Sequence, residues 1–110
     1  MPQSNVVTSQ EQMSEIMEAV FQECRNLRDA GQKEYAGVGQ DAFANFNRVA
    51  LMTGIDRRAA LMVYALKHWD GIIHHIKGQI SQRENVRGRI DDLIVYMCLL
   101  RGMIDEEEGK

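Results

Sequence analysis

The feature that most constrains the fold is an apolar run near the C-terminus, Leu93–Leu100 (LIVYMCLL). The Tyr96 hydroxyl is its only polar side-chain group apart from the Cys98 thiol, so a helix formed here would be apolar on every face. A surface helix needs one apolar stripe, whereas a helix without a polar face is surrounded by other helices or by a partner chain. The run therefore predicts the central helix of an all-α core.

Charged residues lead directly into this run, at Arg89, Asp91 and Asp92. An unpaired charge inside a packed core is strongly unfavourable, or its pKa shifts until it is neutral. We therefore expect these side chains to pair with opposite charges or to receive a ligand. The alternative for the two aspartates is that they only favour the positive end of the helix dipole.

Apolar residues recur at steps of three and four in three further segments, which predicts four helices in all. A capping-box spacing at Thr8–Glu11 predicts the start of the first helix, which should run to about residues 33–35. Asp41 is the expected N-cap of the second helix and Gly54 its C-terminal residue, and Asp56 caps the third. A second capping-box spacing, Ser81–Glu84, predicts the start of the last helix.

We therefore expect an all-α, four-helix bundle-like domain over residues 8–104, with a loose N-terminal tail (1–7) and an acidic, solvated C-terminal tail (105–110). A chain of 110 residues has too few other helices to cover Leu93–Leu100 completely. The bundle is therefore expected to be completed by oligomerisation, as a homodimer or larger assembly.

Composition excludes several classes of protein. A net charge of −3 disfavours a nucleic-acid coating protein, and no apolar run approaches the roughly 20 residues that span a bilayer. Cys24 and Cys98 fall in apolar stripes, which indicates reduced thiols rather than a disulfide. Without a signal-peptide pattern, these features predict a cytoplasmic protein.

Lys67 is the first candidate for chemistry, because on a regular helix it aligns with Ala60, Val63, Tyr64 and Gly71. Its stem should then lie over the core. One interpretation is that the ammonium group only reaches back to water. The other is that it stands at the mouth of a pocket, where it meets a phosphate or an aspartate of the last helix.

Three histidines, His68, His74 and His75, suggest a metal site, but the pattern argues against zinc. His74 and His75 are neighbours and cannot both face one ion on a regular helix, and both cysteines lie far away in sequence. We expect one histidine to face a ligand or water and the others to lie on the surface.

Several short motifs occur together in the order Tyr35-Ala36-Gly37, Asn45-Phe46, Lys67, Asp91-Asp92-Leu93-Ile94 and Tyr96. In this order they resemble small phage-encoded helical proteins of the nucleotide-modification-associated type and, more loosely, the all-α nucleoside triphosphate pyrophosphohydrolases of the MazG type. The resemblance covers Lys33 to Met103 and implies a nucleotide-sized pocket between helices.

The resemblance and the side-chain chemistry together suggest a role for each candidate ligand-binding residue. Lys67 and Arg89 would meet phosphate; Tyr35, Asn45 or Trp69 would contact the base; Asp92 and Tyr96 would position Lys67 or a ribose hydroxyl. The leading hypothesis is a phage accessory protein that binds a nucleotide or nucleotide-derived signal, and sequestration of a host defence signal is one use of such a pocket.

Two alternatives remain open. The first is Mg²⁺-dependent (d)NTP pyrophosphohydrolysis with Glu15, Glu18, Asp91 and Asp92 as metal ligands. The family's later E-x-x-D pair is missing, however, because Gly88 and Arg89 stand three positions before the aspartates. The second is a protein-interaction module that inhibits a host protein through the acidic surface of the first helix and Asp105–Glu108.

Overall fold

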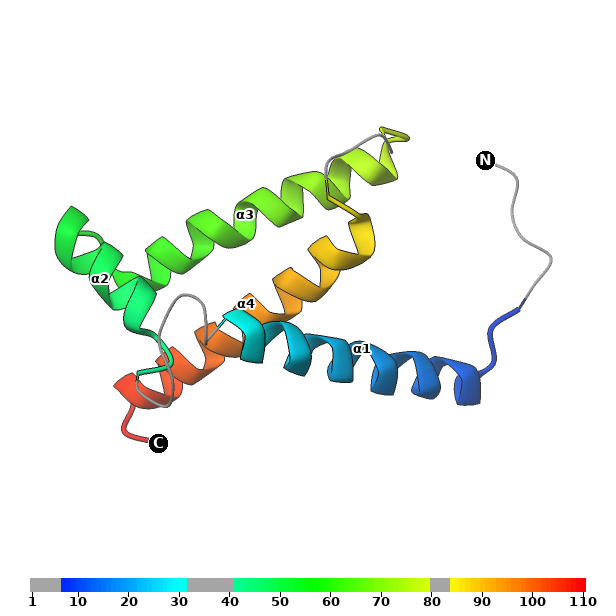
Figure 1. Cartoon of the computed structure of the whole chain (residues 1–110), viewed down its shortest axis with the longest axis horizontal. Coiled ribbons are helices and arrows are strands. Elements are labelled where there is room, and N and C mark those ends of the chain that lie inside the picture. Colours follow the sequence, from blue (N-terminus) through cyan, green and yellow to red (C-terminus); the bar gives the residue numbers. More distant parts are fainter. Residues whose placement is uncertain (1–6, 32–40, 80–83) are drawn as a thin grey trace.

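The computed structural model describes residues 7–31, 41–79 and 84–110, and every regular element in these ranges is a helix. The four helices are α1 (Gln10–Gly31), α2 (Ala44–Thr53), α3 (Arg57–Ile76) and α4 (Val86–Glu107) (Figure 1). The predicted all-α fold is confirmed.

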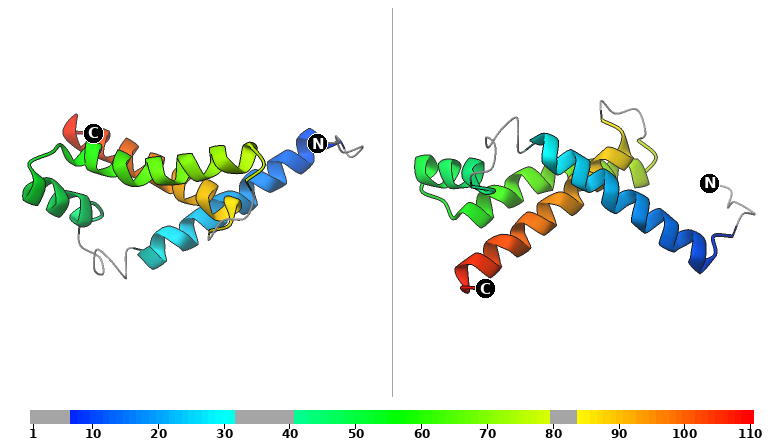
Figure 2. Two further views of the ribbon diagram at one scale, coloured as in Figure 1. Left: turned by 90° about the horizontal axis from the view of Figure 1, so that it is seen from above. Right: turned by 60° about the horizontal axis from the view of Figure 1, so that its bottom comes forward.

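The helix α4 lies at the centre of the arrangement, as its apolar run predicts. It packs against α3, which runs alongside it in the opposite direction, and against α1, whereas α2 packs on α3 (Figure 1). α1 crosses α4 near the C-terminal end of α1, and its N-terminal half projects away from the other helices (Figure 2). One stretch of α1 therefore has no neighbouring helix in the described chain.

A small core forms where α2, α3 and α4 meet. Phe46, Leu61 and Met103 are buried there, and the Phe46 ring packs edge-on against Tyr64 and Tyr96, with centroids 5.9 and 6.2 Å away. Such aromatic contacts stabilise a core beyond the area that they bury. Phe46 therefore belongs to the core.

The apolar run of α4 is less enclosed than its composition predicts. None of its residues is fully buried, Met97 and Cys98 are exposed, and the fully buried residue of α4 is Met103, beyond the run. Among the described residues, α1 and α3 pack along α4, and α2 reaches it at the core through Phe46, so part of the circumference of α4 faces outward. The radius of gyration is accordingly 16.5 Å, against about 13 Å for a compact domain of this length.

The helix ends show which local signals set the boundaries. The N-terminal capping box pairs Ser9 with Gln12, not Thr8 with Glu11: the Gln12 N–H donates to Ser9 Oγ (3.1 Å) and the Ser9 N–H to Gln12 Oε1 (2.8 Å). Glutamine closes such a box as well as glutamate does, which shifts the box by one residue. Gly54 ends α2 with φ of +76°, as predicted.

The other caps agree only in part with the sequence. Asp56 caps α3 by accepting the Arg58 N–H, and its hydrogen bond with the Arg58 side chain lowers the pKa of Asp56 to about 2. The prediction that Asp41 is the N-cap of α2 is wrong: Phe43 holds that position, and the Asp41 side chain accepts the Phe43 N–H just before the helix. The last helix begins later than predicted, since Asn85 is its N-cap; residues 81–83 of the predicted capping box lie outside the described residues.

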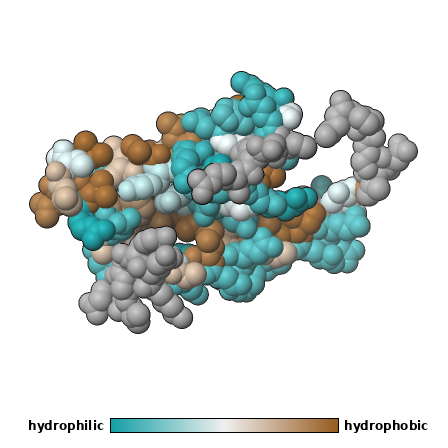
Figure 3. Space-filling view, turned by 45° about the horizontal axis from the view of Figure 1, so that its top comes forward, coloured by the Kyte–Doolittle hydropathy of each residue, from teal (hydrophilic) through white to brown (hydrophobic). Residues whose placement is uncertain are grey.

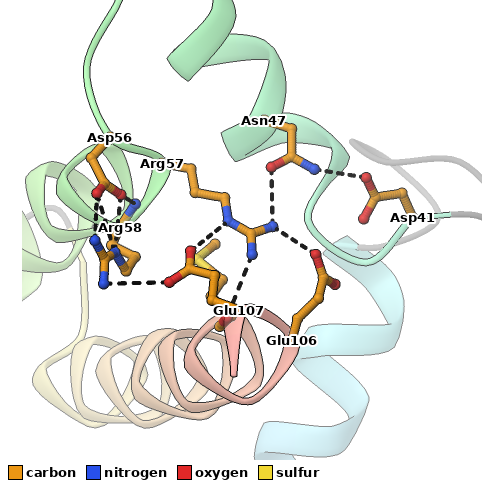
Figure 4. Close-up of polar contacts among 8 residues, drawn as sticks. Asp41, Asn47, Asp56, Arg57, Arg58, Glu106 and Glu107 are labelled. Atoms are coloured by element: carbon orange, nitrogen blue, oxygen red, sulfur yellow. Dashed lines mark hydrogen bonds and ion pairs between the residues drawn. The ribbon is translucent and has the colours of Figure 1, made fainter. Parts of the chain in front are cut away.

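The predicted acidic tail is mostly the last turn of α4, and it binds the start of α3 (Figure 4). The Arg57 guanidinium lies 3.2 Å from a Glu106 oxygen and 3.3 Å from a Glu107 oxygen, and it donates to Asn47 of α2. Glu107 also lies 3.3 Å from Arg58. Paired arginines at the corner between α2 and α3 thus hold the carboxylates that were expected in solvent.

Candidate functional site

The buried face of α3 contains a histidine in place of the expected lysine. Leu61, Ala65 and His68 face inward, whereas Val63 is exposed and the Lys67 side chain is 64% exposed. The predicted position of the Lys67 stem over the core is therefore wrong. The buried face of α3 contains Leu61, Ala65 and His68, so Lys67 lies at the edge of the contact between α3 and α4.

His68 is the buried histidine of the three, whereas His74 is exposed and His75 is half-buried. His68 is 6% exposed, and its ring stacks on Tyr96 of α4 with centroids 5.8 Å apart. Its Nδ1 lies 3.5 Å from Asp92 Oδ2 and 3.6 Å from Glu84 Oε2. Neither distance is a hydrogen bond, and Nδ1 has no hydrogen-bond partner in the described chain.

Arg89 extends from α4 across the surface of α3, and its side chain is 13% exposed. It lies directly over Gly71, where the Cβ atom of any larger residue would overlap with Arg89 Cδ and Nε. The guanidinium Nη1 approaches the Lys67 carbonyl oxygen (3.4 Å) and Glu84 Oε2 (3.6 Å). Glycine at position 71 is therefore what allows this arginine to cross α3.

Glu84, just before the N-cap of α4, is the carboxylate on which these groups converge. It lies 3.7 Å from Lys67 Nζ and 3.6 Å from both Arg89 Nη1 and His68 Nδ1. We name this group the α3–α4 polar cluster, which consists of Lys67, His68, Glu84, Arg89 and Asp92. The sequence predicts an aspartate near Lys67 but not Glu84, because Glu84 belongs to no apolar stripe.

Asp92 is the least solvated carboxylate of the cluster. Burial raises the pKa of this carboxyl group, and the nearby charge of Glu84 adds to the effect, whereas His68, Lys67 and Arg89 oppose it. Arg89 and Asp92, at the start of α4, thus have groups of opposite charge nearby within the cluster, as expected for charged side chains next to a packed interior.

Asp91 faces a different helix, which agrees with the angle of about 100° between adjacent helical positions. Burial raises the pKa of Asp91, and a hydrogen bond with the Glu23 side chain and the Glu23 charge raise it further. Cys24 of α1 lies beside it, with Sγ 3.7 Å from the Asp91 carbonyl oxygen. A carboxyl pair therefore sits at the contact between α1 and α4.

The carboxylates of the predicted Mg²⁺ site do not gather in this chain. Glu15 and Glu18 are exposed on α1, and the α1 carboxylate that reaches Asp91 is Glu23. Within residues 7–31, 41–79 and 84–110, the one group of three or more side chains placed to share a metal ion is His68, Glu84 and Asp92. Asp92 is thus the only member of the predicted set that belongs to such a group.

The residues of the predicted nucleotide pocket fall into two hollows. An open groove of about 610 Å³ lies beside α3, and its lining includes Lys67, Arg89, His74, Val63 and Leu66. A cavity of about 190 Å³ between α1, α2 and α4 is lined in part by Asn45, Asp92 and Tyr96. Trp69 is 51% exposed and lines neither hollow, and Tyr35 lies outside the described residues.

Comparison of the chain with protein-family models, with curated proteins and with solved structures finds no match. The resemblance to phage-encoded nucleotide-binding helical proteins therefore stays a prediction. Across the described helices, none combines the length and apolarity that a bilayer crossing requires.

Proposed function

We propose that the protein binds a phosphorylated, nucleotide-like small molecule in the groove beside α3. The observation that carries the proposal is the convergence of Lys67 and Arg89 on this groove, with Arg89 held nearly buried across Gly71. Guanidinium groups bind phosphate through paired, charge-assisted hydrogen bonds, and an arginine fixed in place loses little side-chain entropy on binding.

The shape of the groove favours a ligand with an organic part as well as a phosphate. Its volume of about 610 Å³ falls within the range of roughly 300 to 1,000 Å³ that is usual for small-molecule sites. Val63 and Leu66 supply an apolar wall, and His74 offers an aromatic ring beside the two cations. A base or sugar would lie against this wall while the phosphate meets Lys67 and Arg89.

Isothermal titration with a nucleoside diphosphate in the presence of a chelator tests the proposal. We expect Arg89→Ala to weaken binding by roughly 10- to 100-fold, because it removes a charge-assisted contact of about 1.5–3 kcal/mol. Lys67→Ala should weaken binding less, because this side chain is mostly exposed. Arg101→Ala is the matched control, since Arg101 is 81% exposed and pairs only with Asp105 among its ionic partners in the described chain.

Two glycine-to-alanine variants, one on α3 and one on α4, test the position of Arg89 without removing its charge. Gly71→Ala puts a methyl group where Arg89 lies, whereas Gly88→Ala meets no atom within 4 Å. We expect weaker nucleotide binding in Gly71→Ala and unchanged binding in Gly88→Ala. Equal affinities in wild type, Arg89→Ala and Gly71→Ala would remove the basis of the proposal.

We also propose that two copies of the chain associate through α1. Met13, Ile16, Met17 and Phe21 are 43–46% exposed and lie on the same face of α1 as the buried Cys24. Only the C-terminal part of this apolar stripe is covered, by α4. A hollow of about 440 Å³ lined in part by Phe21, Ile94 and Cys98 continues the stripe onto α4. Apolar atoms also reach the surface at the α2 end, at the left of Figure 3.

The exposed area supports a second copy as the occupant of this stripe. The chain exposes 8573 Å², whereas a compact monomer of 12.6 kDa exposes roughly 6,200 Å². Obligate homodimer interfaces bury about 2,000–5,000 Å² over both partners, which is of the size needed to remove this excess. A symmetric contact between two copies through α1 would also cover the side of α4 that faces away from the other helices.

A further inference from the structure

We infer that His68, Glu84 and Asp92 form a binding site for a divalent transition-metal ion. Each residue presents one potential ligand atom, and the three atoms lie within 4.8 Å of one another. His68 is 6% exposed, and its Nδ1 faces the two carboxylates without a hydrogen-bond partner in the described chain. A buried polar atom left in this state is unfavourable unless a ligand completes its interactions.

The distances from His68 Nδ1 to the two carboxylate oxygens fit ligands of one metal ion better than direct ion pairs. A protonated imidazole attracts a carboxylate to about 2.7–2.9 Å, but His68 Nδ1 lies 3.5 Å from Asp92 Oδ2 and 3.6 Å from Glu84 Oε2. Two ligands bound at about 2.0–2.2 Å to a tetrahedral ion stand roughly 3.3–3.6 Å apart. The two separations measured from His68 Nδ1 therefore fit ligands of one cation.

The donor set indicates the class of metal. One imidazole nitrogen and two carboxylate oxygens suit Zn²⁺, Mn²⁺ or Fe²⁺, whereas Mg²⁺ and Ca²⁺ prefer oxygen ligands alone. Three protein ligands leave at least one coordination position open. Lys67 holds Glu84 only loosely, at 3.7 Å, so it can turn to a ligand when a metal ion takes the carboxylate.

This inference deepens the proposed function and rests on it only for the identity of the added ligand. Lys67 and Arg89 both border the metal site through Glu84 and also line the groove. A phosphate held by these two cations would lie next to the metal site, although none of the three metal ligands lines the groove itself. The metal would then strengthen nucleotide binding, and binding of the metal alone needs no nucleotide.

Titration of the chelator-treated full chain with Zn²⁺, without nucleotide, tests the site. We expect one ion per chain, and we expect Glu84→Gln and Asp92→Asn each to weaken binding by about tenfold or more. Glu84 is exposed, so Glu84→Gln should fold normally. His75→Gln is the matched control, since His75 lies on the same helix and belongs neither to the metal cluster nor to the groove lining.

Co²⁺ provides a second readout, because the visible absorption of tetrahedral Co²⁺ reports its ligands directly. We expect this absorption in wild type and His75→Gln, and its loss in His68→Gln and Glu84→Gln. Absence of Zn²⁺ binding, or equal affinity in Glu84→Gln, Asp92→Asn and the control, would overturn the site. If the metal site fails this test but the chain still binds nucleotide in the presence of chelator, the proposed function stands.

Discussion

A variant carrying Met17→Glu and Phe21→Glu is expected to be monomeric at concentrations where the wild-type chain is a dimer. Both side chains lie on the uncovered part of the α1 stripe, 46% and 44% exposed. Full burial of such a side chain contributes about 1.5–3 kcal/mol, and roughly half of that remains to be gained here, so the loss of four side chains per dimer should weaken association by more than roughly 100-fold. Two facing glutamates would add repulsion. Light scattering after size exclusion measures the mass directly.

The control variant changes the opposite face of the same helix. Glu15→Gln with Glu18→Gln alters exposed carboxylates that lie off the apolar stripe, and it should leave the dimer intact. Circular dichroism of both variants verifies that α1 remains helical. A monomeric wild-type chain at high concentration, or equal masses for both variants, would show that the stripe is not an interface between copies.

Replacement of Leu61 by alanine is expected to lower the free energy of unfolding by about 2–5 kcal/mol. Leu61 is 0% exposed and packs with Phe46 and Met103 where three helices meet, so its removal leaves a cavity that rigid helices cannot close. Native proteins typically have unfolding free energies of about 5–15 kcal/mol, so this loss would be a large fraction of the total. Urea denaturation at fixed protein concentration gives the value.

Leu51→Ala is the matched control, because the same side chain is 86% exposed on α2. Its effect should stay within about 0.5 kcal/mol. A loss below about 1 kcal/mol for Leu61→Ala, or equal losses for the two variants, would contradict the assignment of the core.

The helical architecture follows closely from local sequence signals. Asp56 and Gly54 mark their helix ends as predicted, and the apolar run identifies α4 as the central helix. The predicted capping box is wrong by one residue because Gln12 serves as well as Glu11. The fate of the C-terminal acids could not be predicted, since it depends on Arg57, which lies about 50 residues earlier in the sequence.

The candidate site was less predictable, for a physical reason. The position of Lys67 was inferred from Ala60, Val63 and Tyr64, but α3 buries the stripe that contains Leu61 and His68. Both stripes have helical spacing, and only packing against α4 chooses between them. The close approach of Arg89 to Gly71 gives one retrospective signal: a glycine within a helix indicates close approach of another chain segment.

The most direct test of the central claim, that the groove beside α3 receives a phosphorylated ligand at Lys67 and Arg89, is an NMR titration of the ¹⁵N-labelled wild-type chain with a nucleoside diphosphate. We predict that the backbone amide shifts change mainly in residues 67–71 and 84–92, and that the unphosphorylated nucleoside causes much smaller changes. Shifts confined to other helices, or equal responses to the two compounds, would contradict the claim.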